Sequence, residues 1–240
     1  MGVQSSLGCG RRRSEAESRA RNVLRAVLER LAAAGALLLC VPVLVAAGAC
    51  IVVESGFPVL FRQRRVGRRG RPFTLLKLRS MLDSDRKSSI TKSSDPRITR
   101  VGGFLRRYKI DELPQLWNIL AGDMQFVGPR PEVPSMVDFT NPAWRIVQSE
   151  RPGLTDLSTL AYRNEEGVLE AYPDTDRAYR EIVLPEKLRL SARYLETRTV
   201  WSDCKLLALS AWYSFFPAGF DPDRILRTFA APQMKGVRRG

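Results

Sequence analysis

The stretch DPRITRVGGFLRRYKIDELPQLWNILAGDMQFVGPRPE, residues 95–132, decides how the rest of the chain is organised. It places two adjacent carboxylates, Asp111 and Glu112, at an expected helix start. Aspartate is a favoured N-cap residue, and proline is tolerated in a first helical turn, where its missing N–H has no intrahelical partner. We therefore expect Asp111 to cap a helix that contains Pro114 and ends near Leu120.

The start of such a helix suits an anion, because it has free N–H groups and the positive end of the helix dipole. Side chains one residue apart diverge by about 100° on a helix, but a cap residue is not yet helical, so Asp111 and Glu112 can converge on one group. One carboxylate would attack while the other holds a metal or moves a proton. For D-E-L-P alone, a capped helix with a solvated acidic first turn is the preferred interpretation, so the surrounding sequence has to decide.

Three blocks of the chain resemble successive blocks of the bacterial sugar transferases, the monotopic phosphoglycosyl transferases. They are FRQRRVGRRGRPFTLLKLRSM at 61–81, the stretch 95–132, and RPGLTD at 151–156. The resemblance runs from about Leu31 to Trp212, and its central block is too long for a chance match.

This resemblance implies transfer of a sugar 1-phosphate from a nucleoside-diphosphate sugar, usually a UDP-sugar, to a polyprenyl phosphate. Asp111 would take the phosphosugar as an acyl phosphate, which the polyprenyl phosphate then attacks. Mg²⁺ would bridge the diphosphate oxygens with Asp111 or Glu112 in its shell. The side chains that would hold phosphate oxygens are Lys77, Arg79, Arg106 and Arg130.

The composition restricts the available chemistry. The 240 residues carry a formal charge of +14, and arginine outnumbers lysine 32 to 7. Guanidinium groups suit bidentate phosphate contacts, so nucleic acid, anionic lipid and a nucleotide sugar are all candidate partners. The absence of histidine excludes His-based triads, His-ligated zinc and the commonest general base. Four dispersed cysteines without a C-x-x-C motif indicate a reduced compartment.

Residues 1–53 indicate attachment to a membrane. Residues 1–30 contain seven Arg after position 10 and resemble a basic arm that becomes a surface helix. Residues 31–53 carry no charge and would form a helix about 34 Å long, enough to span the hydrocarbon layer. Because both flanks are basic and Pro42 divides the segment in half, we instead expect a re-entrant helix with its break at Pro42. The resemblance supports re-entry, although the family usually has Ser-Pro where this chain has Val41-Pro42.

Residues 58–81 predict a β-hairpin with a basic tip, GRRGR. Lys77 and Arg79 alternate with leucines and therefore share one face of the second strand. Arg106 lies five residues before Asp111 and can reach the same diphosphate, although a surface ion pair is an equally ordinary role for it. Arg130 stands between two prolines that restrict its backbone, which suits a fixed phosphate clamp.

The other segments follow from local patterns. We expect a polar loop and possible lid at 82–94, helices at 101–107, 132–148, 175–198 with a break at Pro185, and 200–216, a turn at 151–156, and a mobile basic tail at 217–240. The aromatic residues near the end of the 200–216 helix favour a position in the membrane interface.

The sequence thus predicts a mostly helical α+β protein, with the re-entrant helix before a cytosolic catalytic domain at 54–216 that carries a hairpin and interfacial amphipathic helices. We expect it on the cytosolic face of the bacterial inner membrane, with membrane lipids, polyprenyl phosphate and a nucleotide sugar as partners and no nucleic acid. Two alternatives stay open. One is a non-catalytic basic module that binds anionic lipid or nucleic acid. The other is a degenerate family member, because Lys109 stands where the family usually has a small hydroxylated residue.

Overall fold

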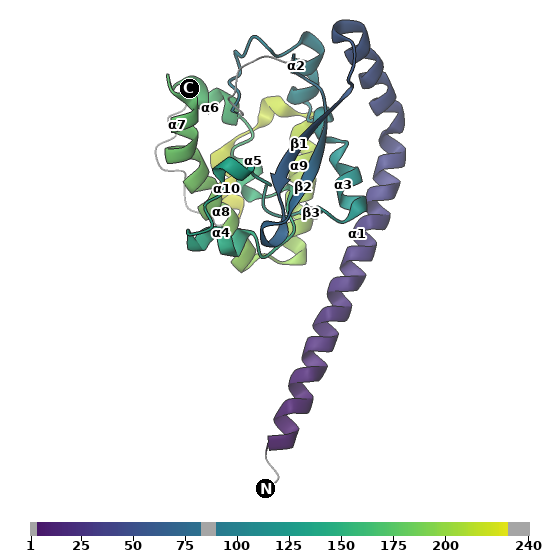
Figure 1. Ribbon diagram of the computed structural model, residues 1–240, viewed down its shortest axis with the longest axis vertical. Coiled ribbons are helices and arrows are strands. Elements are labelled where there is room, and N and C mark those ends of the chain that lie inside the picture. The colour runs from purple at the N-terminus through teal and green to yellow at the C-terminus, as the bar shows by residue number, and fades with distance from the viewer. Residues whose placement is uncertain (1–3, 83–89, 230–240) are drawn as a thin grey trace.

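One long helix dominates the computed structural model, which describes residues 4–82 and 90–229 (Figure 1). Helix α1 (Gln4–Ser55) has 52 residues and contains Pro42. Its part from Val23 to Ser55 is long and apolar enough to cross a membrane, the one such helix among the described residues. The ribbon curves in its upper part, but the helix is not interrupted. The expected break at Pro42 is therefore wrong.

Packing on both sides of Pro42 explains why the helix continues. Ala33 is fully buried in a cluster with Ile119, whereas Ile51 is buried in a second cluster with Leu105. Both ends of the apolar segment thus lie against the rest of the protein. Proline removes one intrahelical hydrogen bond and tends to kink a helix, and these contacts hold the helix in place despite that loss.

The expected β-hairpin is confirmed. Strands β1 (Leu60–Val66) and β2 (Pro72–Leu78) pair antiparallel, with Leu60 opposite Leu78 and Val66 opposite Pro72. A 3₁₀ turn over Arg68–Gly70 forms the basic tip. Gly70 has φ of 76° there, which glycine adopts at little cost.

Helix α2 (Arg100–Arg107) forms almost where the sequence predicts it. Thr99 is its N-cap and accepts a hydrogen bond from the amide of Gly102. A Cβ atom on Gly102 would lie 2.0 Å from the carbonyl oxygen of Ser80, so this glycine lets α2 pack directly on the chain that leaves the hairpin.

The chain then reaches the two carboxylates. Lys109 adopts a left-handed conformation with φ of 58° and leads into a 3₁₀ turn, Ile110–Glu112, followed by α3 (Gln115–Ala121). The expectation that Asp111 caps this helix is wrong, because the chain is already helical in this turn and Pro114 takes the position before α3.

The RPGLTD block contains a strand that local patterns do not predict. Strand β4 (Gly153–Thr155) pairs in parallel with β3 (Gln125–Val127). A Cβ atom on Gly153 would lie 2.1 Å from the amide nitrogen of Gly128. Only glycine permits this approach, which joins two segments far apart in sequence.

The C-terminal half is helical. Its α- and π-helical segments are α4 (Pro142–Val147), α5 (Leu157–Ala161), α6 (Glu165–Glu170), α7 (Thr175–Ala178), a π-helical turn (Tyr179–Val183), α8 (Leu184–Thr197), α9 (Val200–Phe215) and α10 (Pro222–Thr228). The expected break at Pro185 corresponds to the change from the π-helical turn to α8, which has Pro185 in its first turn. The expected helix at 200–216 is confirmed as α9.

Two expectations for this half are wrong. Instead of one helix over 132–148 there is a 3₁₀ turn, Pro134–Met136, and then α4, because Asn141 caps a new helix with proline in its first turn. Residues 217–229 do not form a mobile tail, since Ile225 and Leu226 of α10 are each 1% exposed. Residues 230–240 and most of the expected lid, 83–89, lie outside the described residues.

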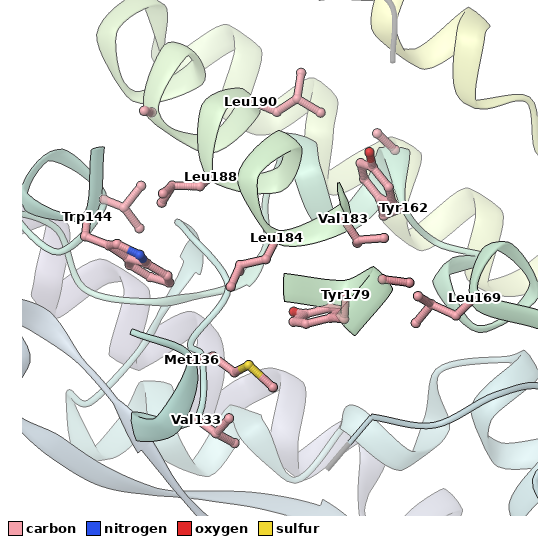
Figure 2. Packing of buried hydrophobic residues seen from close by; sticks show 14 of the residues in the cluster. Val133, Met136, Trp144, Tyr162, Leu169, Tyr179, Val183, Leu184, Leu188 and Leu190 are labelled. Carbon is pink, nitrogen blue, oxygen red and sulfur yellow. The ribbon is translucent and has the colours of Figure 1, made fainter. Parts of the chain in front are cut away.

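The main core joins these short helices around the π-helical turn. Figure 2 shows Tyr179 near the middle of this cluster, with Trp144 of α4 on one side and Leu169 of α6 on the other. Val133 and Met136, which follow the Pro-Arg-Pro turn, pack into the same cluster. The mostly helical α+β class is as predicted, and the core fixes the segment that leads away from Arg130.

Candidate active site

An open cleft of about 920 Å³ brings together residues from the hairpin, α2, the 110–112 turn and the C-terminal helices. It is lined by every side chain that the sequence nominated for substrate or metal binding: Lys77, Arg79, Arg106, Asp111, Glu112 and Arg130. Pro42, on α1, is not among its lining residues.

Asp111 is a buried carboxylate with an unused oxygen. The residue is 5% exposed, and its Oδ1 atom has no hydrogen-bond partner among the described residues. Burial raises the pKa of Asp111, the cation of Lys77 opposes that rise, and the adjacent charge of Glu112 adds to it. Asp111 thus lines the cleft and carries a buried carboxylate oxygen that no described protein group occupies.

Glu112 is in the opposite situation. Its Oε1 atom accepts hydrogen bonds from Arg130 at 2.8 Å and from Lys77 at 3.1 Å, and Lys109 lies 4.0 Å away. Burial opposes ionisation, but Arg130, Lys77 and Lys109 together hold the pKa of Glu112 well below its usual range. Two neighbouring carboxylates thus have pKa values displaced in opposite directions, a pattern typical of catalytic sites.

Arg130 is held from several sides before any ligand arrives. The guanidinium of Arg65 donates to the carbonyl oxygen of Pro131 at 3.0 Å, and the amide of Gly153 donates to that of Pro129 at 3.0 Å. The charge of Glu112, opposed by burial, raises the pKa of Arg130 further. Arg130 is therefore a fixed cation that pairs with Glu112 at the cleft.

Arg106 lies at the same cleft but has its own partners. It forms an ion pair with Glu166 of α6, and its Nη1 atom lies 3.4 Å from the hydroxyl of Ser80. Its buried Nε atom has no hydrogen-bond partner among the described residues. A phosphate at this position would have to compete with Glu166.

Arg79 has a structural set of contacts. Its guanidinium donates to the carbonyl oxygens of Ser55, Gly56 and Phe57, at the end of α1 and just beyond it. The last carbonyls of a helix lack intrahelical partners, so Arg79 satisfies them and joins β2 to α1. The geometry does not support its expected role at a substrate phosphate. Lys77 and Arg79 were expected on one face of the same strand. Because β2 ends at Leu78, the side chain of Arg79 does not follow that of Lys77.

The cleft has further lining residues that sequence reasoning did not single out: Arg65, Glu132, Arg163, Glu165, Tyr179 and Lys187. Arg65 and Glu132 lie within the blocks that carry the resemblance, so they could have been nominated. Tyr179 and Lys187 lie in helices whose charge pattern is that of a solvated face, and nothing local marks them.

Comparisons with known proteins find relatives of this chain. The family model described as "Bacterial sugar transferase" matches residues 20–216. One relative is a Bacillus subtilis (strain 168) protein that is 42% identical over 50% of this chain and 64% of its own length. Its name describes an undecaprenyl-phosphate N-acetylgalactosaminyl 1-phosphate transferase.

Two further relatives are each named UDP-glucose:undecaprenyl-phosphate glucose-1-phosphate transferase. The Caulobacter vibrioides protein is 37% identical over 75% of this chain and 66% of its own length. The Escherichia coli K12 protein is 32% identical over 75% of this chain and 37% of its own length. The chain thus spans less than two thirds of the length of these relatives.

Proposed function

The chain belongs to the bacterial sugar transferase family, and on this premise we propose that it transfers a sugar 1-phosphate from a UDP-sugar to a polyprenyl phosphate. The products are UMP and a polyprenyl diphosphate sugar, which begins the membrane steps of glycoconjugate assembly. One observation carries the proposal: Asp111 presents an unpaired, buried carboxylate oxygen in a cleft that Lys77 and Arg130 also line. The named relatives support undecaprenyl phosphate as the acceptor.

The reaction proceeds in two displacements. The free oxygen of Asp111 attacks the phosphorus that bears the sugar, a P–O bond forms, and the bond from that phosphorus to UMP breaks with its electron pair on UMP. An oxygen of the polyprenyl phosphate then attacks the same phosphorus and releases the carboxylate of Asp111. Splitting the reaction replaces one difficult displacement by two easier ones, with Asp111 carrying the phosphosugar between them.

Cations of the cleft stabilise the charge that develops on the phosphoryl oxygens. Lys77 and Arg130 lie within 3.1 Å of Glu112, so both point at the segment that carries Asp111. Preorganised donors of this kind act without further rearrangement, and they are worth most in a site that excludes water. Glu112 keeps the two cations in place.

The residues fit Mg²⁺ in part. Magnesium is usually held by one or two carboxylates together with substrate phosphates and water, and the unpaired oxygen of Asp111 suits that arrangement. Glu112 does not fit as a ligand, because Arg130 bonds to both of its oxygens. No group of three or more His, Cys, Asp or Glu side chains suited to a metal occurs in the described ranges. When bound, Mg²⁺ would neutralise charge on the diphosphate.

The contacts of α1 support attachment to one face of the membrane. Shortly before the apolar segment, Arg25 of α1 pairs with Asp203 of α9 at 3.1 Å, and at the end of α1 the carbonyl of Ser55 accepts a hydrogen bond from Arg79 at 2.8 Å. Both ends of the apolar segment are thus bonded to the catalytic domain. A helix that crossed the bilayer would carry one end about 30 Å away from it. We therefore favour a monotopic protein on the cytosolic face, where its basic flanks remain.

Exposed side chains define the surface that would enter the lipid. Leu38 and Leu39 of α1 are 74% and 80% exposed, and Trp201 and Phe215 of α9 are 78% and 73% exposed. Several large apolar and aromatic side chains exposed on one protein are typical of a surface that contacts a membrane. They would hold the cleft at the depth of the lipid phosphate.

The test uses purified protein in detergent, a panel of UDP-sugars labelled in the sugar, and mass spectrometry of the polypeptide. We expect label on Asp111 and release of UMP, and neither with Asp111→Asn. Arg177→Gln is the matched control, because this arginine pairs with exposed Glu181 on the surface and does not line the cleft. Salt-sensitive binding to anionic vesicles or nucleic acid without label or UMP would instead indicate a non-catalytic basic module.

A further inference from the structure

A second polar cluster lies in the same cleft, beyond Arg130. Tyr179 donates a hydrogen bond to Glu132 at 2.7 Å, and Lys187 donates to the Tyr179 hydroxyl at 3.2 Å. Lys187 also donates to Glu165 at 2.6 Å and lies 3.7 Å from Glu132. Arg65 approaches Glu132 from the hairpin at 3.7 Å. All five side chains line the cleft.

The two charged clusters that line the cleft, one around Glu112 and one around Glu132, differ in net charge. Three cations, Lys77, Lys109 and Arg130, surround the single paired carboxylate of Glu112. The cluster around Glu112 therefore has an excess of positive charge that suits phosphate, even with Asp111 ionised. The phosphates of a donor are therefore best neutralised there.

The second cluster has no such excess, since its two carboxylates face the two cations Lys187 and Arg65. Burial opposes it, but Glu165, Tyr179 and Glu132 raise the pKa of Lys187, so the lysine stays charged between them. A neutral set of carboxylate acceptors with ammonium and phenol donors is complementary to hydroxyl groups, each of which donates and accepts one hydrogen bond.

The second cluster is rigidly connected to Arg130. Glu132 follows Arg130 by two residues, and its carbonyl oxygen accepts a hydrogen bond from the amide of Val66 at 2.9 Å. Tyr179 is 2% exposed, and its ring packs in the main core (Figure 2). Side chains fixed by packing and backbone contacts are suited to reading the position of a hydroxyl group.

Resting on the proposed function, we propose that Glu132, Tyr179, Lys187 and Glu165 form a subsite for a hydroxyl-bearing ring of the donor, while Arg130 and Lys77 hold its diphosphate. A nucleotide sugar has two such rings, the hexose and the ribose, and both offer the same chemistry. This subsite selects among donors, whereas Asp111 carries out the transfer.

The test compares Tyr179→Phe and Glu165→Gln with the wild type. Tyr162→Phe is the matched control, because Tyr162 is buried in the same core, does not line the cleft, and its hydroxyl has no hydrogen-bond partner among the described residues. Two quantities are measured: kcat/KM for the UDP-hexose that the wild type uses best, and the inhibition constant of UDP, which has the ribose but lacks the hexose.

If the subsite holds the hexose, Tyr179→Phe and Glu165→Gln lower kcat/KM about fivefold to tenfold, the size of one hydrogen bond, and leave the inhibition constant of UDP unchanged. If it holds the ribose, both quantities worsen by the same factor. The proposal is overturned if neither quantity changes, or if Tyr162→Phe causes the same loss as Tyr179→Phe. Should Tyr179→Phe fail to fold, the result for Glu165→Gln decides. Failure of the wild type to use any donor would instead overturn the proposed function.

Discussion

Replacing Glu112 by glutamine should destabilise the protein although the change is nearly isosteric. The side chain is 9% exposed and sits between Arg130 at 2.8 Å and Lys77 at 3.1 Å. Glutamine can still accept a hydrogen bond but takes away the nearest counter-charge of two partly buried cations. Removing one partner from a buried ion pair costs about 3–5 kcal/mol, and the remaining hydrogen bond places this change near the lower end.

The neighbouring carboxylate provides the matched comparison. Asp111→Asn removes a buried charge whose Oδ1 atom has no hydrogen-bond partner among the described residues. We expect its stability to stay within about 1 kcal/mol of the wild type, while turnover is lost. The two adjacent residues thus separate stability from catalysis, with Glu112 supporting the site and Asp111 reacting in it.

Thermal unfolding in detergent, followed by the fluorescence of the four tryptophans, measures both variants at one scan rate. A loss of about 3 kcal/mol lowers the midpoint of Glu112→Gln by about 10 °C, whereas Asp111→Asn should shift it little. The neighbours of Glu112 depress its pKa below the ordinary value of 4.5, so its stabilisation is complete above pH 4.5 and declines as the pH falls further. The difference between Glu112→Gln and wild type should shrink in that range. Equal midpoint shifts for the two variants would refute the described ion cluster.

Three further predictions follow from close contacts and from charge. Gly153→Ala should lower stability by about 3 kcal/mol or more and reduce kcat/KM, since its Cβ atom would lie 2.1 Å from the Gly128 amide nitrogen. Its control is Gly35→Ala, which has open space around it and should be neutral or slightly stabilising. Equal effects of the two substitutions would contradict this packing. Arg79→Ala should lower the unfolding midpoint with an unchanged KM for the donor, and a raised KM would return Arg79 to the phosphate site. Because burial raises the pKa of Asp111 and attack requires the carboxylate, kcat/KM should fall as the pH drops through that raised value; a profile flat down to the ordinary Asp range near 3.8 would count against it.

Local patterns were sufficient for elements whose signals lie within a few residues. The hairpin at 58–81 has two apolar strands around a glycine-containing turn, and α2 follows a threonine cap. Aromatic and apolar spacing likewise predicted α9. These features depend on neighbours in sequence, and the structure confirms them. Asp111 was identified through the motif block, although its predicted capping role was wrong.

The chain itself thus determined the family, the mostly helical class and the pair of carboxylates, because these depend on residue types at short spacing. Only the tertiary structure decided which groups those residues meet. Pro42 did not break α1, because buried contacts such as Ala33 and Ile51 hold the helix on both sides. Arg79 turned to the end of α1, while Lys187 joined Glu132 in the cleft from α8. Ion pairing and burial act between segments far apart in sequence, and no local pattern contains that information.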